Sequence, residues 1–263
     1  MNRAALALAA LVCAPAAFAF DPVTIDGAPP LQALWRAAGA GKRPAVLLLH
    51  GCGGLFGARG APQSRYKDYA SRFAAAGWHT LMPDSFGARG RREICTERER
   101  TVTVAMRRDD ALRALAWLAA RDDVDAARIA VVGWSHGASA LLATLLAASE
   151  PKPAAAVAFY PGCAQALRGV AAPATPLLLL LGEKDDWTPP APCQALAERW
   201  RAQGADVAVQ TFADAVHGFD GDRPLRLRHD IPSRPAGVHV GGNAAARADA
   251  LRALDEFLMR MLK

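Results

Sequence analysis

The sequence predicts an α/β protein, with a mostly parallel central sheet and helices on both of its faces. Continuous apolar runs of strand length occur at residues 45–49, 129–133 and 177–181. Such runs are typical of strands that are buried on both faces of a parallel sheet. Segments with apolar residues at helical spacing, 64–76 and 102–120, lie between the first two runs. With 263 residues and 52% hydrophobic composition, the chain can form one such domain with a complete core.

The beginning of the chain, residues 1–19, is predicted to be a secretory signal peptide and not part of the fold. Arg3 supplies a positive n-region, residues 4–12 form an apolar core, and residues 17–19, Ala-Phe-Ala, match a cleavage site. The apolar stretch is too short to span a bilayer comfortably. We therefore expect residues 20–263 to form a single periplasmic or secreted domain with no membrane attachment after cleavage.

The charge of the chain does not indicate a nucleic-acid partner. The formal net charge is +6, and the basic residues are scattered apart from one run at residues 89–100. No recognition motif accompanies this charge, so a solvated basic surface explains it better. The sequence does not indicate an oligomeric state.

The first strand of the predicted sheet ends in a glycine-rich loop. Before it, residues 21–30 suggest an irregular arm with at most one short edge strand, and residues 31–38 suggest a short helix. The apolar strand at 45–49 then runs into His50-Gly-Cys-Gly-Gly54. Glycines at the end of a buried strand let the backbone approach a ligand closely. We therefore expect this loop to border the functional site.

A helix, a strand and a long arginine-rich loop follow. Residues 64–76 form an amphipathic pattern that gathers Tyr66, Tyr69, Ala70 and Phe73 on one face, and residues 78–82 form the next strand. The loop at 85–100 follows that strand, so it is expected at the carboxyl edge of the sheet, above the site. Arg89 in this loop is a candidate for binding a substrate carboxylate. A solvated charged loop is the alternative interpretation.

The most informative motif is a strand that ends abruptly in Gly133-Trp-Ser-His-Gly137 and continues into a helical pattern at residues 138–149. A short G-x-S-x-G motif also occurs by chance in sequences rich in glycine and alanine. The order strand, motif and helix is what a nucleophile elbow requires, because the serine occupies a strained turn between small residues. Ser135 is therefore predicted to be a nucleophile.

Two later loops supply the partners that such a serine needs. Asp185 follows the strand at 177–181, and His217 follows the predicted strand at 207–212, which gives the chain order Ser, Asp, His. Asp186 is the reserve for the carboxylate, and an acidic surface turn is the alternative interpretation. The remaining predicted elements are a strand at 154–160, helices at 190–203 and 243–262, and an Arg/Pro-rich excursion at 223–235.

Backbone amides and aromatic side chains complete the predicted site. Behind a nucleophile elbow, an N–H of the loop after the first central strand and the N–H after the nucleophile form the oxyanion hole. These are the amides of Cys52 and His136, whereas the side chains of His136 and His50 are expected to be structural. No metal or cofactor is needed. The residues expected to wall an apolar acyl pocket are Trp134, Tyr160, Trp187 and Phe219.

Four cysteines remain after signal cleavage, namely Cys52, Cys95, Cys163 and Cys193. Their number is even, and no C-x-x-C pair suggests a metal or redox centre. Of three possible pairings we favour Cys52 with Cys95 and Cys163 with Cys193, because each pair lies in loops that follow neighbouring predicted strands. Four buried free thiols remain the alternative.

The motifs together resemble the dienelactone hydrolase family of α/β-hydrolases, in particular its exported, serine-dependent branch. The resemblance covers residues 44–219 and rests on the order of six segments, which are 49–54, 83–89, 133–137, 159–162, 182–189 and 217–219. It implies an α/β-hydrolase fold, with Ser135 as nucleophile, His217 as general base and acid, and Asp185 as the carboxylate that orients His217. The founding members differ, since they use a cysteine nucleophile and carry an acidic side chain where this chain has Gly51.

The resemblance implies a serine hydrolase that cleaves small or medium carboxylic esters or lactones through an acyl-enzyme, with a small-molecule ester as its partner. A serine peptidase is one alternative, because the triad alone does not separate ester from amide hydrolysis. A polymer-surface esterase of the cutinase or lipase type is another. A third alternative, of a different class, is a non-catalytic binding protein on a hydrolase scaffold.

Overall fold

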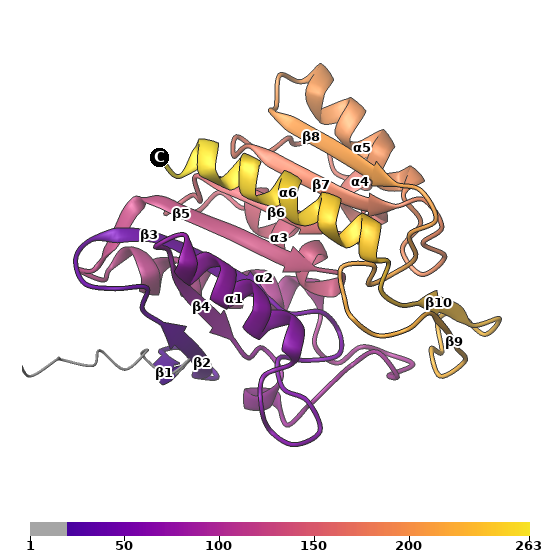
Figure 1. Cartoon of the computed structure of the whole chain (residues 1–263), viewed down its shortest axis with the longest axis horizontal. Coiled ribbons are helices and arrows are strands. Elements are labelled where there is room, and N and C mark those ends of the chain that lie inside the picture. The colour runs from indigo at the N-terminus through magenta and orange to yellow at the C-terminus, as the bar shows by residue number, and fades with distance from the viewer. Residues whose placement is uncertain (1–19) are drawn as a thin grey trace, which may run out of the picture.

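The computed structural model describes residues 20–263 (Figure 1), so the predicted signal peptide lies outside the described residues. A central sheet has the strand order β1-β2-β4-β3-β5-β6-β7-β8. All neighbours from β4 to β8 pair in parallel, whereas β2 is antiparallel to both β1 and β4. The mostly parallel sheet that the sequence predicts is therefore confirmed. Its strands are β1 Asp21–Ile25, β2 Leu31–Arg36, β3 Arg43–Leu49, β4 His79–Pro83, β5 Val124–Trp134, β6 Ala155–Phe159, β7 Leu177–Gly182 and β8 Val207–Phe212.

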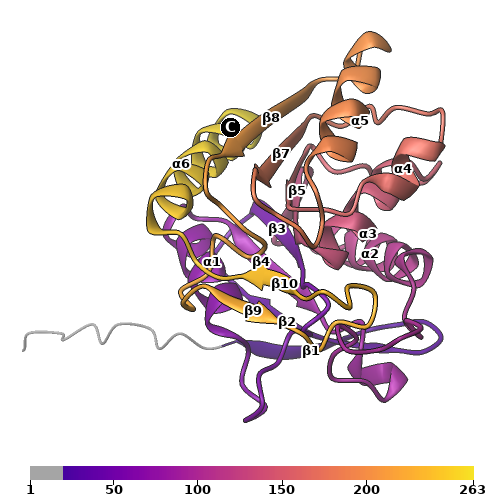
Figure 2. The same cartoon turned by 90° about the vertical axis from the view of Figure 1, so that its right-hand side faces the viewer.

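Helices cover both faces of this sheet, as predicted (Figure 2). Helices α1 (Ser64–Ala75) and α6 (Ala244–Met261) pack on one face. Helices α2 (Val104–Ala119), α3 (His136–Leu145) and α5 (Ala191–Ala202) pack on the other, beside the short α4 (Ala164–Arg168). Successive residues of the central strands enter the two opposite cores, which explains why these strands are apolar without interruption.

The segment at residues 31–38 is a strand, so the predicted short helix is wrong. Leu31, Ala33 and Trp35 are buried, whereas the residues between them are exposed or half-buried. This alternation of two residues suits a strand with one face on the core. It pairs with β1, an edge strand that tolerates Pro22 because that edge needs no donor there.

A two-stranded ribbon lies at the carboxyl edge of the sheet, within the excursion after β8 (Figure 2). Its strands are β9 (Arg226–Arg228) and β10 (Val238–Val240). His217 forms an isolated bridge with Val240, which attaches the ribbon to the loop after β8. No helix within residues 20–263 is long and apolar enough to cross a membrane.

A small apolar cluster, here called the roof cluster, joins the ribbon to the loops after β3, β4 and β7. Its members come from segments that are distant in sequence and meet above the carboxyl edge. They are Cys52, Phe86, Ile94, Cys95, Val102, Trp187, Ile231 and Val238.

Candidate active site

Ser135 occupies a sharp turn between β5 and α3, with φ 52° and ψ −118°. A non-glycine residue at positive φ is strained, and the surrounding structure must hold it there. A Cβ atom at Gly133 would lie 2.9 Å from the backbone N of Ala138, and one at Gly137 would lie 2.1 Å from the carbonyl O of Leu49. Both positions therefore require glycine, and α3 can approach the end of β3 only because Gly137 has no side chain.

The three residues of the predicted triad lie within hydrogen-bond distance of one another. Nε2 of His217 lies 2.9 Å from Oγ of Ser135, and its Nδ1 lies 2.8 Å from Oδ2 of Asp185. All three side chains are buried. This arrangement lets an imidazole accept the serine proton at one nitrogen while a carboxylate holds its other N–H.

The loop after β7 fixes the carboxylate. Oδ1 of Asp185 accepts hydrogen bonds from the backbone N–H groups of Trp187 and Thr188, at 3.0 and 2.8 Å. The reserve candidate, Asp186, instead lies 2.7 Å from Nδ1 of His239 on β10. The structure thus brings Asp185, and not Asp186, to His217.

Thr188 is a neighbour of the triad that the sequence analysis did not single out. Its Oγ1 lies 2.9 Å from Oδ2 of Asp185, 3.1 Å from Nδ1 of His217 and 3.1 Å from the carbonyl O of Tyr160. Its single hydroxyl proton is shared between the carbonyl O of Tyr160 and Oδ2 of Asp185. Thr188 therefore connects the end of β6 to the carboxylate of the triad. The ring of Tyr160 lies edge-on to His217, with 4.6 Å between ring centroids.

Both amides predicted for the oxyanion hole belong to segments at Ser135. His136 follows it in the chain, and a Cβ at Gly51, the residue before Cys52, would lie 3.7 Å from Cβ of Ser135. The N–H of His136 belongs to the first turn of α3, where amides have no partner within the helix and the helix dipole favours negative charge. The N–H of Cys52 lies in the loop after β3, and among the described residues neither amide has a hydrogen-bond acceptor. The neighbouring N–H of Gly51 is occupied, since it donates to the hydroxyl of Tyr66 at 2.9 Å.

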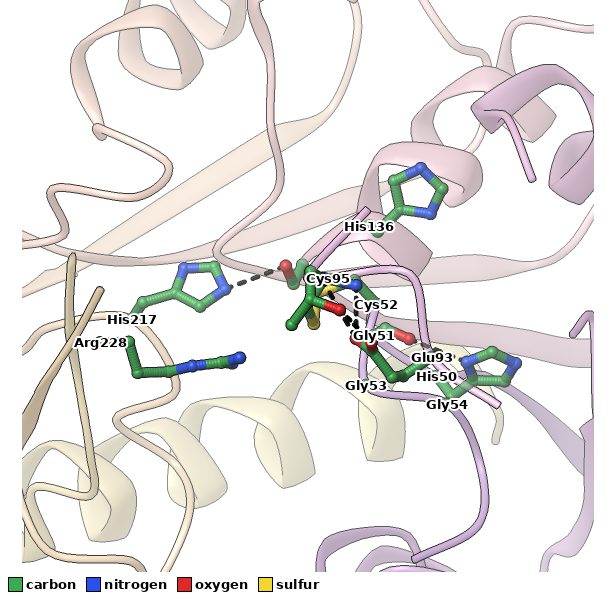
Figure 3. The surroundings of a disulfide bond; sticks show 12 residues. His50, Gly51, Cys52, Gly53, Gly54, Glu93, Cys95, His136, His217 and Arg228 are labelled. Carbon is green, nitrogen blue, oxygen red and sulfur yellow. Dashed lines mark hydrogen bonds between the residues drawn. A yellow bond between two sulfur atoms is a disulfide. The ribbon is translucent and has the colours of Figure 1, made fainter. Parts of the chain in front are cut away.

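The imidazoles of His136 and His50 do not contact Ser135. Nδ1 of His136 lies 3.0 Å from Nη1 of Arg107, and Figure 3 shows its ring turned away from His217. Burial, with the charge of Arg107 beside it, lowers the pKa of His136 to about 2, so its imidazole is neutral. Burial also lowers the pKa of His50, whose Nδ1 lies 2.9 Å from the carbonyl O of Gly51.

Asp220 is a buried carboxylate below the site that the sequence analysis missed. It accepts hydrogen bonds from the hydroxyl of Tyr160 at 2.6 Å, from Nε1 of Trp134 at 2.8 Å and from the hydroxyl of Tyr69 at 3.1 Å. Burial raises the pKa of Tyr69 and Tyr160 well above the usual value, so both keep the proton that they donate. Arg65 adds an ion pair, with 3.3 Å between Nε and Oδ2. Asp220 thus connects the loop of His217 to α1, β5 and the end of β6.

A cavity of about 700 Å³ opens above Ser135 and His217. Trp187, Tyr160 and Trp134 belong to its lining, although Trp134 has no exposed surface. Its rim is basic, because six arginines outnumber three carboxylates there. The arginines are Arg59, Arg65, Arg223, Arg226, Arg228 and Arg247, and the carboxylates are Asp68, Asp220 and Asp222. Three of the arginines form ion pairs, Arg65 with Asp220, Arg228 with Asp230 and Arg247 with Asp68.

Two residues predicted to bind substrate do not reach this cavity. The guanidinium of Arg89 makes two hydrogen bonds to the buried carboxylate of Asp110 on α2, at 2.7 and 2.9 Å, and one to the carbonyl O of Ser85. Because both of its terminal nitrogens are engaged inside the protein and its Nε is buried, the assignment of Arg89 to substrate is wrong. Phe219 has no exposed surface and packs against Phe212, so its assignment to the pocket wall is wrong as well.

The four cysteines form two disulfides, Cys52–Cys95 and Cys163–Cys193, which is the pairing that the sequence analysis favours. Cys52 and Cys95 belong to the lining of the cavity, whereas the second pair lies outside it. Within residues 20–263, no group of three or more His, Cys, Asp and Glu side chains could hold a metal ion.

Comparisons of the sequence and of the structure with known proteins indicate one protein family and one fold. The model of the family described as "Dienelactone hydrolase family" matches residues 32–262. No curated protein sequence matches the chain. A dienelactone hydrolase-like promiscuous phosphotriesterase from metagenomic libraries shares 21% identity and a TM-score of 0.70, over 93% of this chain and 99% of that one. A propionate-bound esterase of Thermogutta terrifontis shares 19% identity and a TM-score of 0.67, over 92% and 94% of the two chains.

Proposed function

The chain belongs to the dienelactone hydrolase family of ester-bond hydrolases, and from this premise we propose that it is a serine esterase that acts through Ser135, His217 and Asp185. One observation carries the proposal. An unbroken series of hydrogen bonds leads from the serine hydroxyl through the imidazole to a buried carboxylate, beside two amides that have no acceptor within residues 20–263. Binding alone would not require this combination.

The proposed reaction has two steps. In the first, Nε2 of His217 takes the proton of Ser135 as Oγ attacks the ester carbonyl carbon, and the amides of Cys52 and His136 hold the oxyanion. The imidazolium then gives that proton to the departing alcohol, which leaves an acyl-enzyme. In the second, water gives a proton to His217 and attacks the acyl carbon, and Ser135 leaves with the proton returned. Each oxyanion donor of this kind contributes about 2.7–4 kcal/mol to stabilisation of the transition state.

The test is labelling with a fluorophosphonate, followed by mass spectrometry of the modified peptide. A Thermogutta terrifontis esterase of this fold is phosphorylated by paraoxon, so an organophosphorus reagent is a suitable probe. We expect one adduct, on Ser135, and its loss in His217→Ala. A folded protein that hydrolyses no ester and takes up no label would contradict the proposal and favour the binding-protein alternative.

The competing hydrolase functions are separated by substrate. Matched ester and amide substrates of the same acyl group distinguish an esterase from a peptidase. A profile over acyl chain length, with an insoluble polyester beside it, distinguishes a small-molecule esterase from one that acts on polymer surfaces. We propose small or medium esters, because the ribbon and the loop after β3 both border the cavity above Ser135.

The basic rim further suggests esters that carry an anionic group. Arg228 belongs to the lining, and Figure 3 shows its guanidinium directed at the loop of residues 50–54. Its Nε and Nη2 donate to Asp230 at 2.9 and 2.8 Å, so Nη1 is the nitrogen that we propose for an anionic ligand. A charged hydrogen bond contributes about 1.5–3 kcal/mol, so Arg228→Gln should lower kcat/KM for the monoester of a dicarboxylic acid at least about 10-fold. Kinetics with the neutral analogue should be nearly unchanged, and Arg252→Gln, on α6 and outside the cavity, is the control. Equal losses with both substrates would contradict selection for anions.

The disulfides suggest where the protein works. Disulfides persist in oxidising compartments, and this chain has two of them. Together with the predicted signal peptide, they support a periplasmic or secreted enzyme.

A further inference from the structure

The Cys52–Cys95 disulfide joins the predicted oxyanion loop to the long loop after β4 (Figure 3). Cys52 has two roles in this arrangement. Its backbone N–H is the donor proposed for the oxyanion, and its side chain carries the cross-link. The disulfide and the proposed oxyanion donor therefore belong to the same residue, so the cross-link acts directly on the backbone that carries this N–H.

Hydrogen bonds also hold the backbone at that amide. The carbonyl O of Gly51, in the same peptide group, accepts from the N–H of Gly54 at 3.2 Å and lies 2.9 Å from Nδ1 of His50. Cys52 stands between Gly51 and the pair Gly53-Gly54, and glycine has the largest conformational freedom of any residue. Side chains hold the loop on either side, since the N–H of Gly51 donates to Tyr66 and Nε2 of Gln63 donates to the carbonyls of Gly53 and Gly54. These contacts fix the turn internally, and the disulfide is its covalent link to the loop after β4.

The loop that carries Cys95 is itself well anchored. The N–H of Ile94 donates to the carbonyl O of Cys52 at 2.8 Å, and the N–H of Cys95 donates to Oε2 of Glu93 at 2.7 Å. Arg92 passes so close to the loop that a Cβ at Gly54 would lie 2.1 Å from its carbonyl O. Ile94 and both sulfur-bearing residues belong to the roof cluster, with Cys52 only 4% exposed. The disulfide thus fastens a glycine-rich loop to a packed one.

We propose that Cys52 and Cys95 are positioning residues for the oxyanion hole, so that esterase activity requires their disulfide to be closed. This inference rests on the proposed function. Opening the bond keeps the Cys52 amide and its neighbouring hydrogen bonds, but it removes the covalent restraint on the direction of that amide. A misplacement of about 1 Å in a catalytic group can cost about 10²-fold in rate.

The second disulfide provides a matched control. Cys163–Cys193 spans 30 residues and Cys52–Cys95 spans 43, so the two cross-links constrain the unfolded chain to a similar extent. Cys163 and Cys193 are outside the lining of the cavity. A purely stabilising role would therefore give the two pairs the same effect.

The experiment compares Cys52→Ser/Cys95→Ser with Cys163→Ser/Cys193→Ser at a temperature below the unfolding transition of both, with near-ultraviolet circular dichroism as the check on folding. For a neutral activated ester we expect kcat to fall about 10²-fold in the first variant with KM nearly unchanged, because the lost interaction exists only in the transition state. The rate of fluorophosphonate labelling at Ser135 should fall in parallel. The control variant should retain kcat within about twofold, because a substitution away from the active site usually changes free energies by less than about 0.5 kcal/mol.

Two further measurements keep the inference testable if the first variant does not fold. Cys52→Ala/Cys95→Val retains apolar side chains in the roof cluster, and it should show the same loss of kcat. The Cys163→Ser/Cys193→Ser protein can also be treated with a dithiol, which gives two electrons and two protons to the Cys52–Cys95 bond and becomes a cyclic disulfide itself. Activity should fall with the fraction of open pairs, counted by alkylation and mass spectrometry, and return on reoxidation.

Full kcat in a folded protein whose Cys52–Cys95 pair is open would overturn the inference, as would equal losses in the two double variants. Failure of the proposed function looks different. In that case the oxidised native protein itself would neither hydrolyse esters nor take up label at Ser135.

Discussion

Replacement of Ser135 by alanine is expected to lower kcat for activated esters about 10⁶-fold, the loss seen when a triad nucleophile is removed. No other hydroxyl lies within hydrogen-bond distance of Nε2 of His217 among the described residues, so no second nucleophile can take over. The measurement is steady-state and single-turnover hydrolysis of a chromogenic ester. The variant should remain folded, because the backbone N–H of residue 135 still donates to the carbonyl O of Phe159.

Ser149→Ala, in the turn after α3, is the matched control for this substitution, and it should behave like the unmodified protein. Turnover by Ser135→Ala within about tenfold of the original rate would refute the nucleophile assignment, since neither the oxyanion amides nor binding could supply a rate of that size alone.

Replacement of Asp220 by alanine is expected to lower the free energy of unfolding by about 3–5 kcal/mol, as removal of one partner from a buried charged network does. The change would leave the hydroxyls of Tyr69 and Tyr160 and the indole N–H of Trp134 without their acceptor inside the protein. Urea unfolding followed by tryptophan fluorescence measures the effect.

Activity should fall with stability in this variant, because Tyr160 packs against His217. Asp222→Ala is the control. Asp222 is exposed in the same loop, so its replacement should change the free energy of unfolding by less than about 0.5 kcal/mol. Similar values for the two variants would show that the contacts of Asp220 do not stabilise the fold.

The order of elements and the meeting of Ser135, Asp185 and His217 could be predicted because each rule involved is local. Apolar runs indicate buried strands, the elbow has a short motif, and loops after parallel strands gather at one edge. The helix expected at 31–38 fails for the same reason, since a short apolar segment has no strong periodicity and the neighbouring strands decide its conformation. Whether the three residues perform the proposed chemistry stays a prediction.

Side-chain partners far apart in the sequence could not be predicted. The position of its loop predicts Arg89 at the site. Instead, its guanidinium forms an ion pair with the buried carboxylate of Asp110 on α2. Phe219 is adjacent to the loop of His217 in sequence, yet the turn directs its ring into the core. Asp220 was missed because a charged residue in a loop normally suggests surface, and its donors come from as far as 151 residues away.

Each disulfide joins cysteines that are consecutive in residues 20–263. In a chain that emerges from its N-terminus onward, Cys52 and Cys95 are both available before Cys163 appears, and each thiol meets its partner before it meets a competitor. Loop closure also favours the nearer cysteine. The topology of the cross-links therefore suits biogenesis by direct oxidation in the order of synthesis, without a later step that reshuffles wrong pairs.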